Sequence, residues 1–360
     1  MSGPRGEELL VLLLEKTVAA KGTDLHLCAG SRPMMRVRSR LAPVEGMERM
    51  GPREVEDLVC SQLNPERLER LKRQKSIDFS YSKSNLGRFR CNVYLQRGTY
   101  AMAIRTLPLE IPRFETLGLP PVVKGFTARR QGLVLVTGAT GSGKSTTLAS
   151  LLDVVNAGHP YHVVTIEDPI EYLHRHKSSM VTQREVGEDA NSFASALKAA
   201  LREDPDVIMV GEMRDLETIS IALTAAETGH LVLSTLHTGN AVKAIDRIVD
   251  VFPTDQQNQV RSQLASVLEG IVSQQLVPGK EEGALVLAAE VMVATPAVRN
   301  LIREGKHHQV NGLIQTGSKH GMVCLERSLA DLCLAGKIDR EEAAMKAHDL
   351  QLLESFLQRG

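Results

Sequence analysis

Gly138-Ala139-Thr140-Gly141-Ser142-Gly143-Lys144-Ser145 is the stretch that decides the fold of this 360-residue chain. It matches the phosphate-binding pattern G-x-x-x-x-G-K-[ST]. An apolar, β-branched run at 132–137 comes before it, and a run typical of a helix start follows at 146–152. Because glycines let backbone N–H groups point inward and a helix N-terminus carries partial positive charge, this strand–loop–helix context predicts a phosphate cradle.

The loop predicts ATP and Mg²⁺ as cofactors. We expect Lys144 to reach the β- and γ-phosphates and the Ser145 hydroxyl to bind Mg²⁺. The alternative, a glycine-rich turn that binds nothing, is disfavoured by the flanking segments. The residues expected to hold the nucleotide are Gly138, Ala139, Thr140, Gly141, Ser142, Gly143, Lys144, Ser145 and Thr146.

Composition excludes several classes of protein. Lys plus Arg equals Asp plus Glu, 43 each, and tryptophan is absent, so neither a nucleic-acid partner nor a base-stacking surface is expected. The five cysteines are scattered with no C-x-x-C pair, which indicates reduced thiols and no zinc module. The apolar run Leu9–Leu14 is too short for a membrane span or a secretory signal. We therefore expect a soluble chain that reaches a membrane only through partners.

Two domains are expected in an α/β chain. The first, 1–106, is a small α+β domain, and prolines at 108, 112, 120 and 121 indicate a linker over 107–121. The second, 122–360, alternates apolar strands with helices, which predicts a parallel sheet; its tail from Pro253 is expected to be helical around one strand-like run. The helices expected in the first domain are 6–20 and 52–71, and the strands expected along the chain are 23–27, 34–38, 77–81, 88–94, 100–105, 133–137, 162–167, 207–210, 231–235 and 284–292.

A carboxylate follows the strand at 207–210. Hydrolysis of a phosphoanhydride needs a group that orients or deprotonates water, and Glu212 at the carboxyl end of this strand is the candidate. Most P-loop enzymes carry a metal-binding Asp just before this Glu, whereas here Gly211 stands there. The plainer interpretation of Glu212 is an ordinary polar residue after a core strand.

Acidic and histidine side chains follow two further strands. Glu167, Asp168 and Glu171 predict a Mg²⁺ shell, direct or through water, although they could be a charge cluster at a helix start. His230 and His237 stand at the two ends of the strand 231–235. A His at a carboxyl end can hydrogen-bond a γ-phosphate, so His237 is favoured, and the roles of His230 and Glu171 stay open.

The order of these segments resembles the secretion-type hexameric ATPases, with their Walker A loop, Asp box, Gly-Glu form of Walker B and His box. Within them, the chain is similar over nearly its whole length to the PilT-type retraction ATPases of type IV pili. Besides the boxes, the resemblance rests on Thr23-Asp24-Leu25-His26-Leu27, on Gly87-Arg88-Phe89-Arg90 and on Ala297-Val298-Arg299-Asn300-Leu301-Ile302-Arg303-Glu304.

The resemblance implies a RecA-like core with a PAS-like N-terminal domain, assembled into homohexamers. It implies catalytic roles for Glu212, Lys144, Glu167 and His237, and a Mg²⁺ site at Ser145, Glu167 and Asp168. Arginines of the N-terminal domain, Arg88, Arg90 and Arg105, would reach the phosphates; their plainer interpretation is solvated strand-edge charge. Hydrolysis would swing the domains about the proline-rich hinge and drive pilin subunits out of the fibre.

The family also implies a cytoplasmic protein, peripheral at the inner face of the bacterial inner membrane, that binds the pilus platform protein and the pilus base. The helix 297–304 is either a surface helix or a contact face for the pilus base or a neighbouring subunit. Four alternatives stay open: an assembly or type II secretion ATPase, a PilU-like accessory retraction ATPase, a nucleic-acid translocase, and a nucleotide-dependent scaffold that barely hydrolyses. The missing zinc module disfavours an assembly or type II secretion ATPase. The main retraction motor is favoured over a PilU-like accessory ATPase by the segments 202–206 and 297–304.

Overall fold

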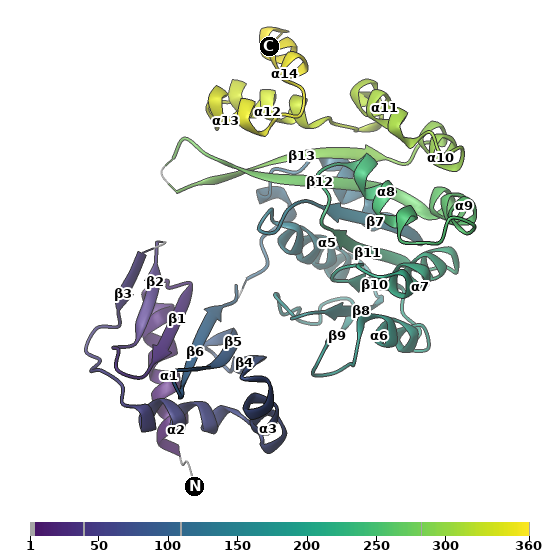
Figure 1. Ribbon diagram of the computed structural model, residues 1–360. Helices are drawn as coiled ribbons and strands as arrows, with labels where there is room; N and C mark the ends of the chain where they lie inside the picture. The colour runs from purple at the N-terminus through teal and green to yellow at the C-terminus, as the bar shows by residue number, and fades with distance from the viewer. Residues whose placement is uncertain (1–3, 39, 109, 282, 360) are drawn as a thin grey trace. The chain divides into compact units, whose positions relative to one another are not determined.

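The computed structural model describes residues 4–38, 40–108, 110–281 and 283–359. The chain divides into two compact units, Met1–Glu110 and Ile111–Gly360 (Figure 1). Each unit is described by itself. Across the described ranges, no helix combines the length and the apolar character that a membrane span requires.

The first unit is an antiparallel sheet covered by helices, as expected for a small α+β domain. Its strands lie in the order β3-β2-β1-β6-β5-β4, and every neighbouring pair is antiparallel. One face packs its apolar side chains, such as Phe89 and Val93, against Leu13 of α1 and Leu58 of α2. The elements are α1 Pro4–Ala19, β1 Asp24–Cys28, β2 Met34–Val37, β3 Arg40–Pro43, α2 Pro52–Gln62, α3 Pro65–Gln74, β4 Ser76–Lys83, β5 Gly87–Gln96 and β6 Thr99–Thr106.

Two features of this unit differ from the sequence prediction. The helix expected over 52–71 is two helices, because Pro65 forces the preceding residues out of the helical region: Leu63 and Asn64 have ψ angles of 130° and 166°. The Asn64 side chain then accepts the N–H of Arg67 and caps α3. Strand β3 was not predicted; its four residues are mostly exposed and pair only with β2.

The second unit is built on a seven-stranded sheet with the order β13-β12-β7-β11-β10-β8-β9. All neighbours are parallel except β12 and β13, which form an antiparallel hairpin. The predicted parallel α/β core is confirmed. Its strands are β7 Gly132–Thr137, β8 His162–Glu167, β9 Met180–Glu185, β10 Val207–Val210, β11 Leu231–Leu236, β12 Leu268–Pro278 and β13 Leu285–Val293.

Helices cover both faces of this sheet. Helix α5 packs on one face, where Leu151 and Val155 meet Val134 and Val136 of β7. Helices α6 to α9 pack on the other face against residues such as Leu133 and Leu135. Because β7 is enclosed on both sides, all six of its residues are buried. The helices are α5 Lys144–Gly158, α6 Phe193–Ala200, α7 Leu216–Glu227, α8 Ala241–Asp250 and α9 Gln257–Val267.

Beyond β13 lie the helices of the C-terminal tail (Figure 1). They are α10 Pro296–Arg303, η3 His307–Gln309, α11 Val310–Thr316, η4 Ser318–His320, α12 Leu325–Leu334, α13 Arg340–Lys346 and α14 Leu350–Arg359. The helical tail and the strand near 284–292 were predicted, but β12 was not. It follows α9 without an intervening turn, and polar residues such as Ser273 and Gln274 interrupt its apolar pattern.

Residues 111–121 of the proline-rich segment belong to the second unit. This stretch contains η1 Phe114–Thr116 and leads into α4 Pro121–Gly125 and η2 Phe126–Ala128. Phe114 and Leu119 are buried with the apolar face of α5. The hinge role and the domain borders at 106 and 122 stay predictions.

Candidate active site

The carboxyl ends of four neighbouring parallel strands meet at one edge of the second sheet. Strands β7, β11, β10 and β8 lie side by side in that order. The glycine loop follows β7, His237 follows β11, Glu212 follows β10, and Glu167 is the last residue of β8. The topology therefore gathers the loop and three expected catalytic side chains at a single edge.

The glycines of the loop allow close packing that a side chain would prevent. Gly138 has φ of 147°, and a Cβ atom there would lie 2.4 Å from both the Gln274 carbonyl oxygen and Ser142 Oγ. Gly141 and Gly143 have φ of 79° and 87°, in the left-handed region that glycine adopts without strain. The buried Ser142 hydroxyl has no hydrogen-bond partner among the described residues. Such a cradle fits a ligand rich in acceptor oxygens.

Lys144 is buried at the start of α5 and lies over the loop. Its Nζ donates to the carbonyl oxygens of Gly138 at 3.0 Å and of Ala139 at 2.9 Å. Burial lowers the pKa of Lys144, whereas the carboxylates of Glu171 and Glu212 act in the opposite direction. The Lys144 ammonium group lies at the loop near carboxylates and the half-buried Ser145. This position is suited to the binding of phosphate oxygens.

Glu167 is buried and its carboxylate is already hydrogen-bonded. Its Oε1 accepts the Thr165 hydroxyl at 2.7 Å and the Gln183 amide at 3.1 Å. Burial raises the pKa of Glu167 to about 7, and the two donors act in the opposite direction. The Glu167 carboxylate is therefore better suited to hold a water molecule or a proton in a fixed position than to act as a freely exposed metal ligand.

Glu212 has a different environment. Its side chain is 16% exposed and forms an ion pair with Arg214, at 2.6 Å from Nε to Oε1. His237 Nε2 lies 3.4 Å from Oε2 of the same carboxylate, and the His237 side chain is 43% exposed. A solvent-accessible carboxylate between a cation and an imidazole is suited to orient and deprotonate a water molecule.

Gly211 permits tight packing between β10 and β8. Its N–H donates to the Ile166 carbonyl at 2.8 Å, and its own carbonyl accepts the Thr235 hydroxyl at 2.6 Å. A Cβ atom at 211 would lie 3.2 Å from the Ile166 carbonyl oxygen. Gly211, which stands where most P-loop enzymes carry an Asp, thus allows the ends of β10 and β8 to approach closely.

The remaining candidates divide into two groups. Asp168 and Glu171 are exposed after β8, on the loop-bearing edge, and Glu171 affects the pKa values of Lys144 and Glu167. His230 lies at the opposite end of β11, where its Nδ1 is 2.9 Å from the Ala225 carbonyl oxygen. Since strands β7 and β11 run parallel in register, His230 is a full strand length from the loop.

The three arginines expected to reach the phosphates belong to the first unit. Arg88 and Arg90 alternate with the buried Phe89 on β5, and Arg90 faces Arg105 of β6 in register. The three therefore share the face of the sheet opposite its core. Arg105 Nε donates to Asp24 Oδ1 at 3.0 Å, and Arg88 Nη1 donates to Ser82 Oγ at 3.2 Å. Their role at the phosphates stays a prediction.

The donor set fits Mg²⁺ only in combination with a nucleotide. Among the described residues, no three His, Cys, Asp or Glu side chains converge as a metal site. Mg²⁺ commonly takes one or two protein oxygens and completes its shell with phosphates and waters. Ser145 at the start of α5 and the exposed Asp168 offer such oxygens, and on Glu167 the two donors already bond Oε1.

Sequence reasoning missed several side chains of the site. Gln183 comes from the unpredicted strand β9, opposite Thr165, and links Glu167 to the Tyr172 carbonyl. The Tyr172 hydroxyl is in turn hydrogen-bonded to the hydroxyl of Thr146 on α5, at 2.9 Å between the oxygens. Gln274, from the unpredicted β12, donates to Thr147 at 2.7 Å. No local pattern marks them, because their contacts depend on which strands are neighbours in the sheet.

Comparisons with known proteins agree with this geometry. A family model described as "Type II/IV secretion system protein" matches residues 120–320. The "Type IV pilus retractation ATPase PilT" of Pseudomonas aeruginosa is 46% identical over 340 residues, covering 93% of this chain and 97% of that protein. The "Type IV pilus ATPase PilU" of the same organism is 40% identical over 350 residues, covering 96% and 90%.

A solved structure is similar over nearly the whole length. The "Crystal Structure of the Pilus Retraction Motor PilT and Bound ADP" matches with a TM-score of 0.90 and 47% identity, covering 95% of this chain and 98% of that one. Fold and sequence therefore lead to the same group of proteins.

Proposed function

This chain belongs to the type II/IV secretion ATPase family and, within it, to the PilT-type retraction ATPases, and we propose that its ATP hydrolysis powers the retraction of type IV pili and thereby twitching motility. The observation that carries the proposal is the convergence of the glycine loop, Glu167, Glu212 and His237 at one sheet edge. A nucleotide-binding edge with a solvent-accessible carboxylate is what hydrolysis requires.

Each side chain has a proposed task. The loop N–H groups and Lys144 bind the β- and γ-phosphates, so Lys144 exchanges its carbonyl partners for phosphate oxygens. Glu212 takes a proton from the attacking water, and His237 donates a hydrogen bond to the γ-phosphate. Glu167 holds its position through Thr165 and orients the water or the metal shell.

Mg²⁺, when bound, would neutralise charge on the phosphates; Ser145 and Asp168 would hold it, Asp168 through water. The proposal includes a homohexamer in which Arg88, Arg90 and Arg105 stabilise charge on the transferred phosphoryl group. In this proposal the protein acts in the cytoplasm, at the inner face of the inner membrane, through the pilus platform protein and the pilus base. Support comes from the sheet face opposite the core, which the three arginines share and on which Arg90 and Arg105 are exposed.

Helix α10 supports the coupling part of the proposal. Its apolar residues Val298 and Ile302 are buried in the core of the unit, whereas Asn300, Arg303 and Glu304 are exposed. The surface that could contact the pilus base or a neighbouring subunit is therefore this polar side. The accessory retraction ATPase stays the second candidate, because the PilU relative aligns over nearly the whole chain.

ATP turnover of Glu212→Gln tests the hydrolytic part. We expect a fall of about 100-fold or more in kcat, because the amide cannot accept the proton. Glu217→Gln is the matched control, since Glu217 is exposed on α7 and pairs with Lys198 of α6, which is not a residue of the candidate site. Turnover by Glu212→Gln at the parental rate would overturn the proposed mechanism and leave a nucleotide-dependent scaffold.

A further inference from the structure

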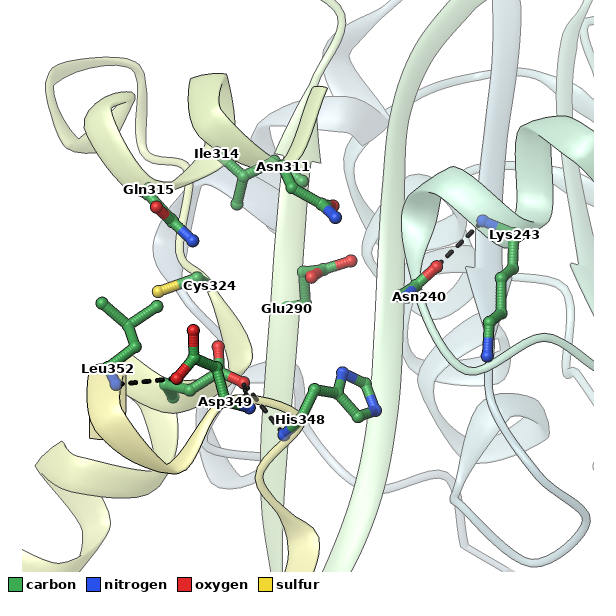
Figure 2. A pocket seen from close by; sticks show the side chains of 11 residues that line it. Asn240, Lys243, Glu290, Asn311, Ile314, Gln315, Cys324, His348, Asp349 and Leu352 are labelled. Atoms are coloured by element: carbon green, nitrogen blue, oxygen red, sulfur yellow. Dashed lines mark hydrogen bonds between the residues drawn. The ribbon is translucent and has the colours of Figure 1, made fainter. Parts of the chain in front are cut away.

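A polar cavity of about 400 Å³ lies in the second unit, among α8, β13, α11, α12 and the start of α14 (Figure 2). Glu290, Cys324 and Glu326 form its buried floor. Lys243 and Asn311 are exposed at its rim. None of these residues belongs to the candidate active site, and the volume is within the range of small-molecule sites.

Glu290 leaves one acceptor free inside the cavity. The residue is 7% exposed, and its Oε1 accepts the backbone N–H of Ala241 at 2.8 Å. Its Oε2 has no hydrogen-bond partner among the described residues. Figure 2 shows the carboxyl group among the side chains that line the cavity. A carboxylate that is mostly buried but keeps one oxygen without a donor favours a ligand that brings an N–H group.

The second buried carboxylate adds negative charge and is held in place by backbone. Glu326 Oε1 accepts the N–H groups of His348 at 3.0 Å and Asp349 at 3.1 Å. The Asp349 side chain caps α14 by accepting the Leu352 N–H at 3.0 Å. The cavity is lined by three acidic side chains, Glu290, Glu326 and Asp349. The basic side chains of its lining are the ammonium group of Lys243 and the exposed His348. The lining is therefore acidic overall.

These features select one class of ligand. An anion would meet three carboxyl groups, and an apolar ligand would leave Glu290 Oε2 unpaired. No set of three metal-ligating side chains converges among the described residues, which disfavours a metal ion. A cation with several N–H donors satisfies the carboxylates and the rim amides of Asn311 and Gln315 together. We propose that this cavity binds an ammonium or guanidinium group.

The cavity also touches the element that follows His237. Glu290 holds the first N–H of α8, and the N-cap residue of that helix, Asn240, stands three residues after His237. A cation on Glu290 would thus act on the helix that anchors the His237 segment. This link extends the proposed function, but binding itself does not depend on ATP turnover.

Binding of the cation should depend on pH. Burial, with a smaller effect of Glu326, raises the pKa of Glu290 to about 7, and the Ala241 N–H acts in the opposite direction. The titratable groups that line the cavity with it are Glu326, Asp349, Lys243, His348 and the thiol of Cys324, whose pKa is raised mainly by burial. A cation pairs with the ionised carboxylate, so its binding releases a proton and strengthens as pH rises through about 7.

Calorimetric titration of the full chain with agmatine, which carries both an ammonium and a guanidinium group, tests the proposal. We expect saturable binding to one site, up to about tenfold tighter at pH 8 than at pH 6. Glu290→Gln keeps an acceptor for the Ala241 N–H but removes the charge. It should weaken binding at least about tenfold and remove the pH dependence. Glu341→Gln, at an exposed carboxylate of α13 that does not line the cavity, should bind as the parent does.

Two further arms complete the test. Gln315→Arg places a guanidinium at the exposed rim, where folding tolerates it, and should abolish agmatine binding. Short peptides carrying a single Lys or Arg, competed against agmatine, distinguish a basic side chain of a partner from a free amine as the source of the cation. If neither agmatine nor a basic peptide binds, or if Glu290→Gln binds agmatine like the parent at pH 8, the proposal is wrong.

Discussion

The two glutamates nearest the phosphate loop differ in what surrounds them. Glu212 is accessible and lies between Arg214 and His237, whereas Glu167 is enclosed with Thr165 and Gln183 on one oxygen. Desolvation raises the pKa of Glu167 to about 7. We infer that Glu212 exchanges a proton with water and that Glu167, held in a fixed position, orients that water.

Gln183 positions Glu167 and gives the first prediction at this scale. Its amide donates to Glu167 Oε1 at 3.1 Å and to the Tyr172 carbonyl at 2.9 Å. Gln183→Ala should lower kcat by about 10-fold or more with a smaller change in KM, because loss of a hydrogen bond to a charged group costs about 1.5–3 kcal/mol. Steady-state ATP turnover measures both constants. Gln309→Ala, at an exposed position, is the control; equal kcat values for the two variants would refute the positioning role.

Residues that directly follow predicted strands could be found from the sequence. Glu212 and His237 each stand after an apolar run, and parallel strands bring such positions to one edge. Gln183 and Gln274 could not be found in this way, because their contacts depend on which strands are neighbours and in what register. Sheet order is a long-range property that local pattern does not encode.

At the scale of elements, Arg299 joins α10 to the end of α9. Its guanidinium donates to the carbonyl oxygens of Ala294, Ala265 and Ser266 at 2.7–3.0 Å and pairs with Glu269 at 2.7 Å. Unpaired carbonyls at a helix C-terminus favour a nearby cation. Glu269 stands at the irregularity of β12 between Leu268 and Gly270, which pair with Leu133 and Val134 of β7, so this contact also fixes the strand beside the phosphate loop.

Removal of this side chain should destabilise the second unit. We expect Arg299→Ala to lower the free energy of unfolding by about 2–4 kcal/mol, since several bonds to partly buried carbonyls are lost at once. Arg303→Ala, on the exposed side of the same helix, should change it by less than about 0.5 kcal/mol. Chemical denaturation followed by circular dichroism compares them. A similar small change for both variants would mean that Arg299 is not a structural anchor.

The elements that the sequence predicted correctly are those bounded by clear local signals. Strands β8 and β10 begin and end where expected, because each apolar run stops at polar or glycine residues. The α2–α3 break was missed although Pro65 marks it, and β12 was missed because polar residues that bond the loop region interrupt it. Polar residues that bond the candidate site thus interrupt the apolar pattern by which their own strand could have been predicted.

At the scale of the molecule, the buried acid Glu290 makes stability depend on pH. Burial raises its pKa from 4.5 to about 7, with Glu326 adding to the shift. The folded chain then holds this proton more tightly than the unfolded chain does. Its stabilising contribution is therefore complete below about pH 4.5 and is lost as pH rises through about 7.

Glu290→Gln isolates this contribution, because the amide does not titrate. Relative to the parent, the variant should gain stability between pH 4.5 and pH 8, by about 3 kcal/mol at most. Urea unfolding of both proteins at several pH values, without nucleotide, measures the difference. A stability difference that does not change with pH would show that Glu290 titrates normally in the folded chain.

Imaging of labelled pili in the bacterium that carries this gene tests the central claim most directly. The account predicts that deletion of the gene leaves cells with surplus pili that extend but do not retract, and with no twitching. The wild-type gene restores retraction, whereas Glu212→Gln does not. Unimpaired retraction in the deletion strain would leave at most an accessory role, and loss of pili from that strain would contradict a retraction motor outright.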